Sequence, residues 1–174
     1  MRALLILGLM VGCAAETPPP EVAGYRDPSA LIASKADFEA ARFAGRWHQI
    51  AHFPDPAIAD CAGIVTDWTA SGAGFDVTRN CLGPDRRATA RARGTAQVRP
   101  LGRMSLTLEG ADGPLWVLWA DTGYRTAILA RPDGSGGAIV NREPGLPVDR
   151  LRAALEVLDF NGFDTASLVF DGSR

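Results

Sequence analysis

The residues of this chain that could do chemistry begin with its cysteines. Cys61 and Cys81 form a candidate pair, and the only two histidines, His48 and His52, precede them in the sequence. In an exported protein such a pair oxidises to a disulfide, which stabilises a fold by roughly 3 kcal/mol in the chain-entropy model. Two alternatives stay open: a pair of buried thiols, and a metal site with the histidines, although the spacings match no zinc pattern. We expect a disulfide, no metal and no cofactor.

The third cysteine, Cys13, ends an N-terminal segment that is typical of an exported protein. One basic residue, Arg2, precedes an apolar run that ends at Val11, which is the layout of a secretory signal and is too short to span a membrane. The tetrapeptide Met10-Val11-Gly12-Cys13 resembles a bacterial lipobox, whose cysteine becomes the lipid-bearing N-terminus. The sequence thus predicts a signal peptide over 1–12 and lipidation at Cys13. An ordinary signal peptide that leaves Cys13 without a role is the alternative.

A proline-rich stretch separates Cys13 from the main body of the chain. Residues 13–33 include Pro18-Pro19-Pro20 and few apolar residues, so we expect an extended spacer. The remaining residues, 34–174, are enough for one domain with its own core. Nearly every cation is arginine, with Lys35 the only lysine, and the formal net charge of −2 suggests no nucleic-acid partner.

The elements that must position any site are short strands. Apolar and alternating runs follow one another from residue 45 to 141, separated by turn segments such as Ser71-Gly72-Ala73-Gly74 and Gly110-Ala111-Asp112-Gly113. Connectors this short leave no room for crossover helices, so the pattern predicts an antiparallel up-and-down meander that closes into an eight-stranded barrel. The predicted strands are 46–53, 63–69, 74–80, 87–98, 103–109, 115–121, 124–130 and 137–141.

A helix and a short ninth strand are expected after the meander. The helix begins at Pro147, puts Leu151, Leu155 and Leu158 on one face, and stops at Asn161-Gly162. Its acidic residues favour packing against the barrel over lying on a membrane. Residues 167–170 then read as the ninth strand, outside the barrel. The predicted class is therefore all-β, with one C-terminal α-helix.

Three separated motifs resemble those of a known family, the lipocalins. Gly45-Arg46-Trp47 opens the first strand like the family's G-x-W, Asp121-Thr122-Gly123-Tyr124 lies between the sixth and seventh strands, and Arg142 follows the eighth. Within the family they are similar to the bacterial outer-membrane lipoprotein branch, which is itself similar to apolipoprotein D. The resemblance implies that Gly45, Trp47, Asp121, Tyr124 and Arg142 close one end of the barrel, with the guanidinium stacked on the indole. An unrelated β-sandwich with accidental matches is the alternative.

The period-two pattern of the strands suggests which side chains line the interior. On the fourth strand the arginines at 87, 91 and 93 alternate with small residues, and we expect the alanines to face inward and leave room for an apolar ligand. Alternatively, Arg91 or Arg93 near the mouth reaches a carboxylate or phosphate headgroup. The predicted lining is Phe75, Val77, Ala88, Ala90, Ala92, Met104, Leu106, Leu108, Leu115, Val117, Trp119, Ala127 and Leu129.

The same parity argument applies to the first strand. Gln49 and Ala51 share the inward parity of Trp47, so His48 and His52 are expected to face outward. Histidines on an outer face are more often solvated or packed than functional.

These features together favour a binding protein over an enzyme. There is no Gly-x-Ser-x-Gly motif and no metal-ligand cluster, although the resemblance includes relatives that catalyse reactions. We expect an outer-membrane lipoprotein that faces the periplasm and binds a hydrophobic small molecule, a fatty acid or lysophospholipid, for storage, transport or repair of envelope lipids. The alternatives are a stress-response lipoprotein with a filled barrel and no ligand, and a lipocalin-fold enzyme. The chain could also form a homodimer.

Overall fold

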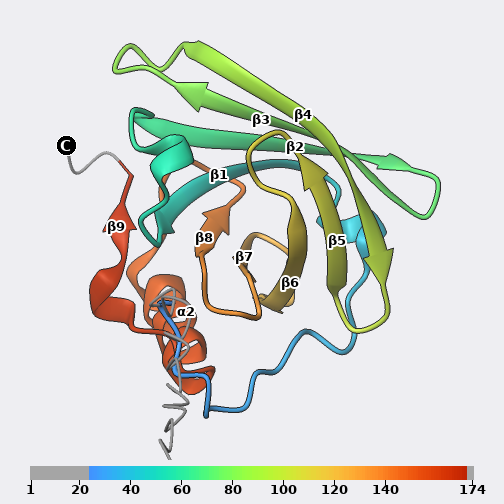
Figure 1. Ribbon diagram of the computed structural model, residues 1–174, viewed down its shortest axis with the longest axis vertical. Coiled ribbons are helices and arrows are strands. Elements are labelled where there is room, and N and C mark those ends of the chain that lie inside the picture. Colours follow the sequence, from blue (N-terminus) through green and yellow to red (C-terminus); the bar gives the residue numbers. More distant parts are fainter. Residues whose placement is uncertain (1–23, 172–174) are drawn as a thin grey trace, which may run out of the picture.

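The structure, a computed structural model, describes residues 24–171. The predicted signal peptide, Cys13 and the first part of the predicted spacer lie outside the described residues. A single barrel with one long helix at its side fills most of the view in Figure 1. In chain order the elements are α1 Ala40–Phe43, β1 Gly45–His52, η1 Pro56–Ile58, β2 Gly63–Ser71, β3 Gly74–Leu82, β4 Ala88–Arg99, β5 Arg103–Leu108, β6 Gly113–Ala120, β7 Thr126–Ala130, β8 Gly137–Asn141, α2 Val148–Phe160, η2 Thr165–Ser167 and β9 Val169–Phe170.

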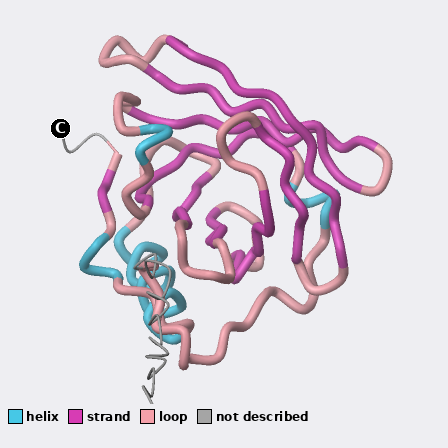
Figure 2. Tube along the Cα trace, viewed as in Figure 1, coloured by secondary structure: helices cyan, strands magenta, loops and turns pink. Residues whose placement is uncertain are grey.

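The sheet closes on itself as predicted. Each strand from β2 to β8 pairs antiparallel with the next, and β1 pairs with both β2 and β8, so the trace in Figure 2 returns to its starting strand. The short β9 pairs with β1 at Ala51 and His52, outside the barrel. The meander, the strand order and the ninth strand are therefore confirmed.

Two apolar clusters lie on opposite faces of the sheet. The inner cluster fills one end of the barrel and includes Phe43, Trp47 and Phe75, while the outer cluster lies between the sheet and α2 and includes Phe53 and Leu158. Every residue of β7 is buried, because its two faces contact different clusters. This double burial explains why the strand reads as a continuous apolar run and not as an alternating one.

The helix α2 covers one side of the barrel. Pro147 immediately precedes its first residue, and Asp149 in the first turn interacts favourably with the helix dipole. Ala154 and Leu158 are buried in the outer cluster. At the other end Gly162 adopts a φ of 81°, a left-handed conformation that favours glycine. No helix in the described part of the chain is long and apolar enough to cross a bilayer.

Register shifts change which side chains face inward, and one of them, between Cys81 and Leu82 of β3, lies opposite Ala90 and Ala88. The register shifts between Gln49 and Ala51 on β1 and between Val117 and Trp119 on β6, and an extra residue in a strand reverses the facing of all that follow. Ala51 and Trp119 consequently pack in the outer cluster, whereas His52 lines the barrel cavity. The predictions that Ala51 and Trp119 face inward and that His52 faces outward are therefore wrong.

The described part of the predicted spacer packs on the domain. Tyr25 stacks on Phe53 with ring centroids 5.0 Å apart, the backbone N–H of Asp27 donates to the Gly162 carbonyl at 2.8 Å, and Figure 1 shows this segment in blue beside α2. Arg26 also forms an isolated bridge with Phe163. The folded unit thus includes residues before the predicted boundary at residue 34, since an aromatic side chain from this segment completes the outer cluster.

The predicted disulfide is present. Cys61 and Cys81 are bonded with an S–S distance of 2.05 Å across 20 residues, which ties the loop before β2 to the end of β3. This bond confirms the disulfide and rules out the alternative of two free thiols. Among residues 24–171 no group of three or more His, Cys, Asp or Glu side chains could hold a metal ion.

Candidate ligand-binding site

The closed end of the barrel is organised around Trp47 and Arg142. The Arg142 guanidinium lies 3.8 Å from the centroid of the Trp47 ring, while the indole Nε1 donates to the Phe43 carbonyl at 2.8 Å. The same guanidinium donates to backbone carbonyls of the α1–β1 segment, at residues 42, 43, 44 and 46, and of Tyr124. One planar side chain thereby joins α1, β1 and the β6–β7 turn.

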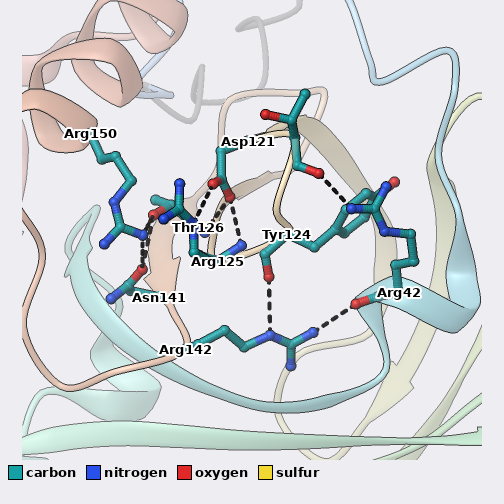
Figure 3. Close-up of polar contacts among 9 residues, drawn as sticks. Arg42, Asp121, Tyr124, Arg125, Thr126, Asn141, Arg142 and Arg150 are labelled. Atoms are coloured by element: carbon teal, nitrogen blue, oxygen red, sulfur yellow. Dashed lines mark hydrogen bonds and ion pairs between the residues drawn. The ribbon is translucent and has the colours of Figure 1, made fainter.

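The β6–β7 turn is held by Asp121 and Tyr124 (Figure 3). The Asp121 carboxylate accepts the backbone N–H groups of Arg125 at 2.6 Å and Thr126 at 2.8 Å, and the Arg125 Nε at 3.0 Å. Burial alone would raise the pKa of Asp121, but these hydrogen bonds outweigh it and lower the pKa. Tyr124 adopts a positive φ of 51°, and its hydroxyl accepts the backbone N–H of Glu39 at 2.8 Å. The turn therefore anchors the segment that precedes α1.

A buried polar cluster joins the barrel to α2. The Thr126 hydroxyl donates to Asn141 Oδ1 at 2.8 Å, and Arg150 of α2 donates to both side chains at 2.9 and 3.2 Å. Figure 3 shows the three side chains converging beside Asp121. Because these groups satisfy one another, the cluster fixes the helix against β7 and β8.

Above the inner cluster the barrel encloses a cavity of about 150 Å³. This is the size of an engineered protein cavity that admits benzene, and it is smaller than a typical drug-sized pocket. Most of its walls are apolar. The lining residues are Gln49, His52, Phe53, Asp55, Ile58, Ile64, Thr66, Trp68, Val77, Arg79, Leu106, Leu108, Ala111, Leu115, Leu129, Arg131, Ser135, Gly136, Gly137, Ala138 and Val140.

Two arginines contribute to this cavity, and they differ in how their donors are used. Arg131 donates to the carbonyls of Asp112 and Ala111, both at 2.8 Å, and so holds the β5–β6 loop. Arg79 has one hydrogen bond described within residues 24–171, a long one of 3.5 Å to the Glu109 carbonyl. Burial lowers the pKa of Arg79, with Asp55 opposing the shift and Arg131 adding to it. Arg79 is thus a cation with donors available to an anionic group.

The alanine face of β4 makes room for Arg79. Ala92 lies directly opposite Arg79 in the β3–β4 register, and the guanidinium extends toward Glu109, which follows β5 on the far side of β4. The small side chains over which it passes leave space for a long cationic one. Arg79, Ala90 and Ala92 also line a groove at the mouth.

Comparison with known proteins identifies the family. Residues 38–172 match the model of a lipocalin-like domain. The chain belongs to the lipocalin family. Outer membrane lipoprotein Blc of Escherichia coli K12 is 23% identical over 167 residues, which cover 93% of this chain and 89% of the relative. Its counterpart in Citrobacter freundii matches with the same identity and coverage.

Solved structures of other lipocalins share the fold. Insecticyanin of the tobacco hornworm Manduca sexta superposes with a TM-score of 0.62 at 17% identity, over 81% of this chain and 84% of that one. Lobster apocrustacyanin A1 gives 0.61 at 20% identity, over 82% and 91%. Identities this low establish the common architecture alone.

The structure distributes the predicted lining over five environments. Val77, Leu106, Leu108, Leu115 and Leu129 line the cavity. Phe75, Met104, Val117 and Ala127 face inward but are packed in the inner cluster. Ala90 and Ala92 line the mouth groove, and Ala88 is exposed at the start of β4. Trp119 lies outside the lipocalin barrel.

The candidate headgroup arginines on β4 face away from the cavity. Arg91 Nε donates at 2.9 Å to Asn80 Oδ1, and Arg93 lies on the same face of the strand, opposite Thr78. Arg91 nevertheless lines the mouth groove together with Ala90 and Ala92, so a headgroup contact by Arg91 or Arg93 stays a prediction. The inward arginine is Arg79, whose parity with Phe75 and Val77 on β3 was the signal that could have found it.

Proposed function

We propose that this lipocalin is a lipid-anchored carrier of an amphiphile, a fatty acid or lysophospholipid, in the bacterial outer membrane. The observation that carries the proposal is a cavity with mainly apolar walls and one incompletely bonded cation, Arg79, at its mouth. Burial of the ligand's apolar acyl chain, which contributes about 25 cal/mol per Å², would drive binding. The guanidinium would hold the carboxylate or phosphate.

The small cavity sets how such a ligand would sit. A volume of about 150 Å³ holds only part of a long acyl chain, so the remainder would extend into the mouth groove beside Ala90 and Ala92. Storage, transport or repair of envelope lipids are the roles compatible with this partial enclosure.

The membrane part of the proposal depends on residues outside the described range. Cys13 stands at the end of a lipobox-like tetrapeptide, and the relatives found in E. coli and C. freundii are named outer membrane lipoproteins. One acyl chain binds a membrane only marginally, so a stable tether needs the several chains of a bacterial lipoprotein. We propose the same anchor here, with the barrel facing the periplasm.

Titration calorimetry with palmitate and lysophosphatidate tests the proposal. The wild-type domain is expected to bind one molecule, and Arg79→Met to bind about tenfold to a hundredfold more weakly, because a hydrogen-bonded charge is lost. Arg93→Met is the matched control, since it removes an arginine from the outer face, and it should bind as the wild type does. Absence of binding to all three proteins would instead favour a filled barrel without a ligand.

A further inference from the structure

The first half of β4 is a strand edge with no neighbour on one side. β4 pairs with β3 from Ala88 to Gln97, but its pairing with β5 begins only at Gly94. A side chain at Gly94 would overlap the carbonyl oxygen of Thr107, so glycine is needed where the two backbones first meet. In the part of the chain that the structure describes, no strand pairs with the other side of residues 88–93, which we name the β4 edge (Figure 1). Its outward backbone N–H and C=O groups are available to a further strand.

Two cations mark the outer face of the β4 edge. Arg91 and Arg93 are exposed, and they lie on the face of the strand opposite to that of Ala92. Neither has an acid directly opposite on β3, because their partners in that register are Asn80 and Thr78. A strand added to this edge would therefore meet two exposed positive charges that are two residues apart along β4.

The inner face of the β4 edge is small and apolar. Ala90 and Ala92 line the mouth groove together with Ile58 and Ile64. Successive side chains of a strand point to opposite faces of the sheet, so every second side chain of an added strand would lie over this groove. The side chains between them would lie opposite the two arginines, where acidic groups are stabilising and basic groups are destabilising. The residue pattern that fits the β4 edge is acidic, apolar, acidic.

A second copy of this chain is a poor occupant of the β4 edge. A two-fold antiparallel pair of these edges presents the same face of both copies on one side of the joined sheet, so Arg91 and Arg93 of both copies would gather there. Centring that pair on Arg91 or on Ala92 puts arginine directly opposite arginine, which is destabilising. The cations thus oppose self-pairing, as charges on natural strand edges do, and favour an acidic strand.

We propose that the β4 edge binds an extended acidic segment of a partner protein, which adds to the barrel as a further strand. Main-chain hydrogen bonds to residues 88–93 supply the affinity, and two acidic side chains opposite Arg91 and Arg93 supply the specificity. The apolar side chain between them lies over Ala92 at the mouth groove. This interaction is independent of the carrier function, because it does not use Arg79.

Binding of synthetic peptides to the full-length protein in detergent tests the inference. The probe is fluorescein-labelled Thr-Glu-Val-Glu-Val-Thr, compared with Thr-Lys-Val-Lys-Val-Thr and with Glu-Glu-Val-Val-Thr-Thr, which has the same composition without the alternation. Fluorescence polarisation is expected to show that the alternating acidic peptide binds about tenfold more tightly than either comparison peptide, because it alone combines two ion pairs with the alternating pattern. The bound peptide should also slow hydrogen exchange of the backbone amides within residues 88–93.

Charge reversal at the β4 edge makes the test decisive. The double variant Arg91→Glu with Arg93→Glu is expected to prefer the lysine peptide about tenfold, and the corresponding double glutamine variant to prefer neither. Arg152→Glu on the exposed face of α2 and Arg79→Met in the cavity are controls, and both should keep the preference for the acidic peptide. Equal binding of all three peptides, absence of binding, a preference that survives charge reversal, or exchange within residues 88–93 that slows with protein concentration alone would overturn the proposal.

Discussion

Truncation of Arg142 is expected to loosen the closed end of the barrel. Its guanidinium donates to five backbone carbonyls and stacks on Trp47 at 3.8 Å. A hydrogen bond from a charged group contributes about 1.5–3 kcal/mol and a partly buried cation–π contact about 1 kcal/mol, but water reaches some of these carbonyls after truncation. We therefore expect Arg142→Ala to lower the free energy of unfolding by about 3 kcal/mol, well above the usual effect of a surface substitution.

Urea denaturation followed by far-ultraviolet circular dichroism, with the disulfide intact, measures this loss. A change of 3 kcal/mol corresponds to a fall in Tm of roughly 6–12 °C for a domain of this size. The free energy of unfolding of Arg142→Lys should lie between those of the wild type and Arg142→Ala, because lysine keeps the charge but lacks the planar guanidinium. Arg152→Ala on the exposed face of α2 is the control and should change stability by about 0.5 kcal/mol or less. If Arg142→Ala is no less stable than this control, the role given to the guanidinium is wrong.

Three further predictions concern the turn, the disulfide and the anchor. Because hydrogen bonds lower the pKa of Asp121, the stability that this carboxylate contributes is present above its unfolded pKa of roughly 3.9 and is lost as pH falls through its folded pKa. Asp121→Asn should therefore reduce the fall in the free energy of unfolding at acidic pH. An equally steep fall in the variant would contradict this. Replacing Cys61 and Cys81 by alanine should cost about 3 kcal/mol for a loop of 20 residues, measured in the same urea assay, whereas equal midpoints would exclude a stabilising bond. Cys13→Ser should release the protein from the membrane fraction of its host, and its retention there would refute the lipobox interpretation.

The strand pattern of this chain was predictable because its turns are rich in Gly, Pro and Asp. The long alternation over 87–98 and the closely spaced turns leave few ways to connect the strands other than a meander. The separated motifs that contain Trp47, Tyr124 and Arg142 indicated the family. The disulfide could be predicted because Cys61 and Cys81 remain as a pair once Cys13 is assigned to the lipobox of an exported chain.

The interior was harder to predict, for two physical reasons. In β6 the run Val117-Leu118-Trp119 is apolar throughout, so period-two reasoning has no marker for the bulge that turns Trp119 outward. On β4 Ala88 and Ala90 are exposed. Ala92 lies opposite Arg79 of the neighbouring strand, which takes up part of the space that the small side chain leaves. The register between neighbouring strands decides such contacts, and the residue pattern of a single strand does not reveal that register.

The most direct test of the carrier function is the mass of the protein as its own host makes it. Native mass spectrometry of the detergent-extracted domain, followed by lipid extraction, is expected to show one bound amphiphile with an anionic head, lost in Arg79→Met and retained in Arg93→Met. Recovery of the wild-type barrel with no bound molecule, under conditions in which added palmitate also fails to bind, would contradict the account.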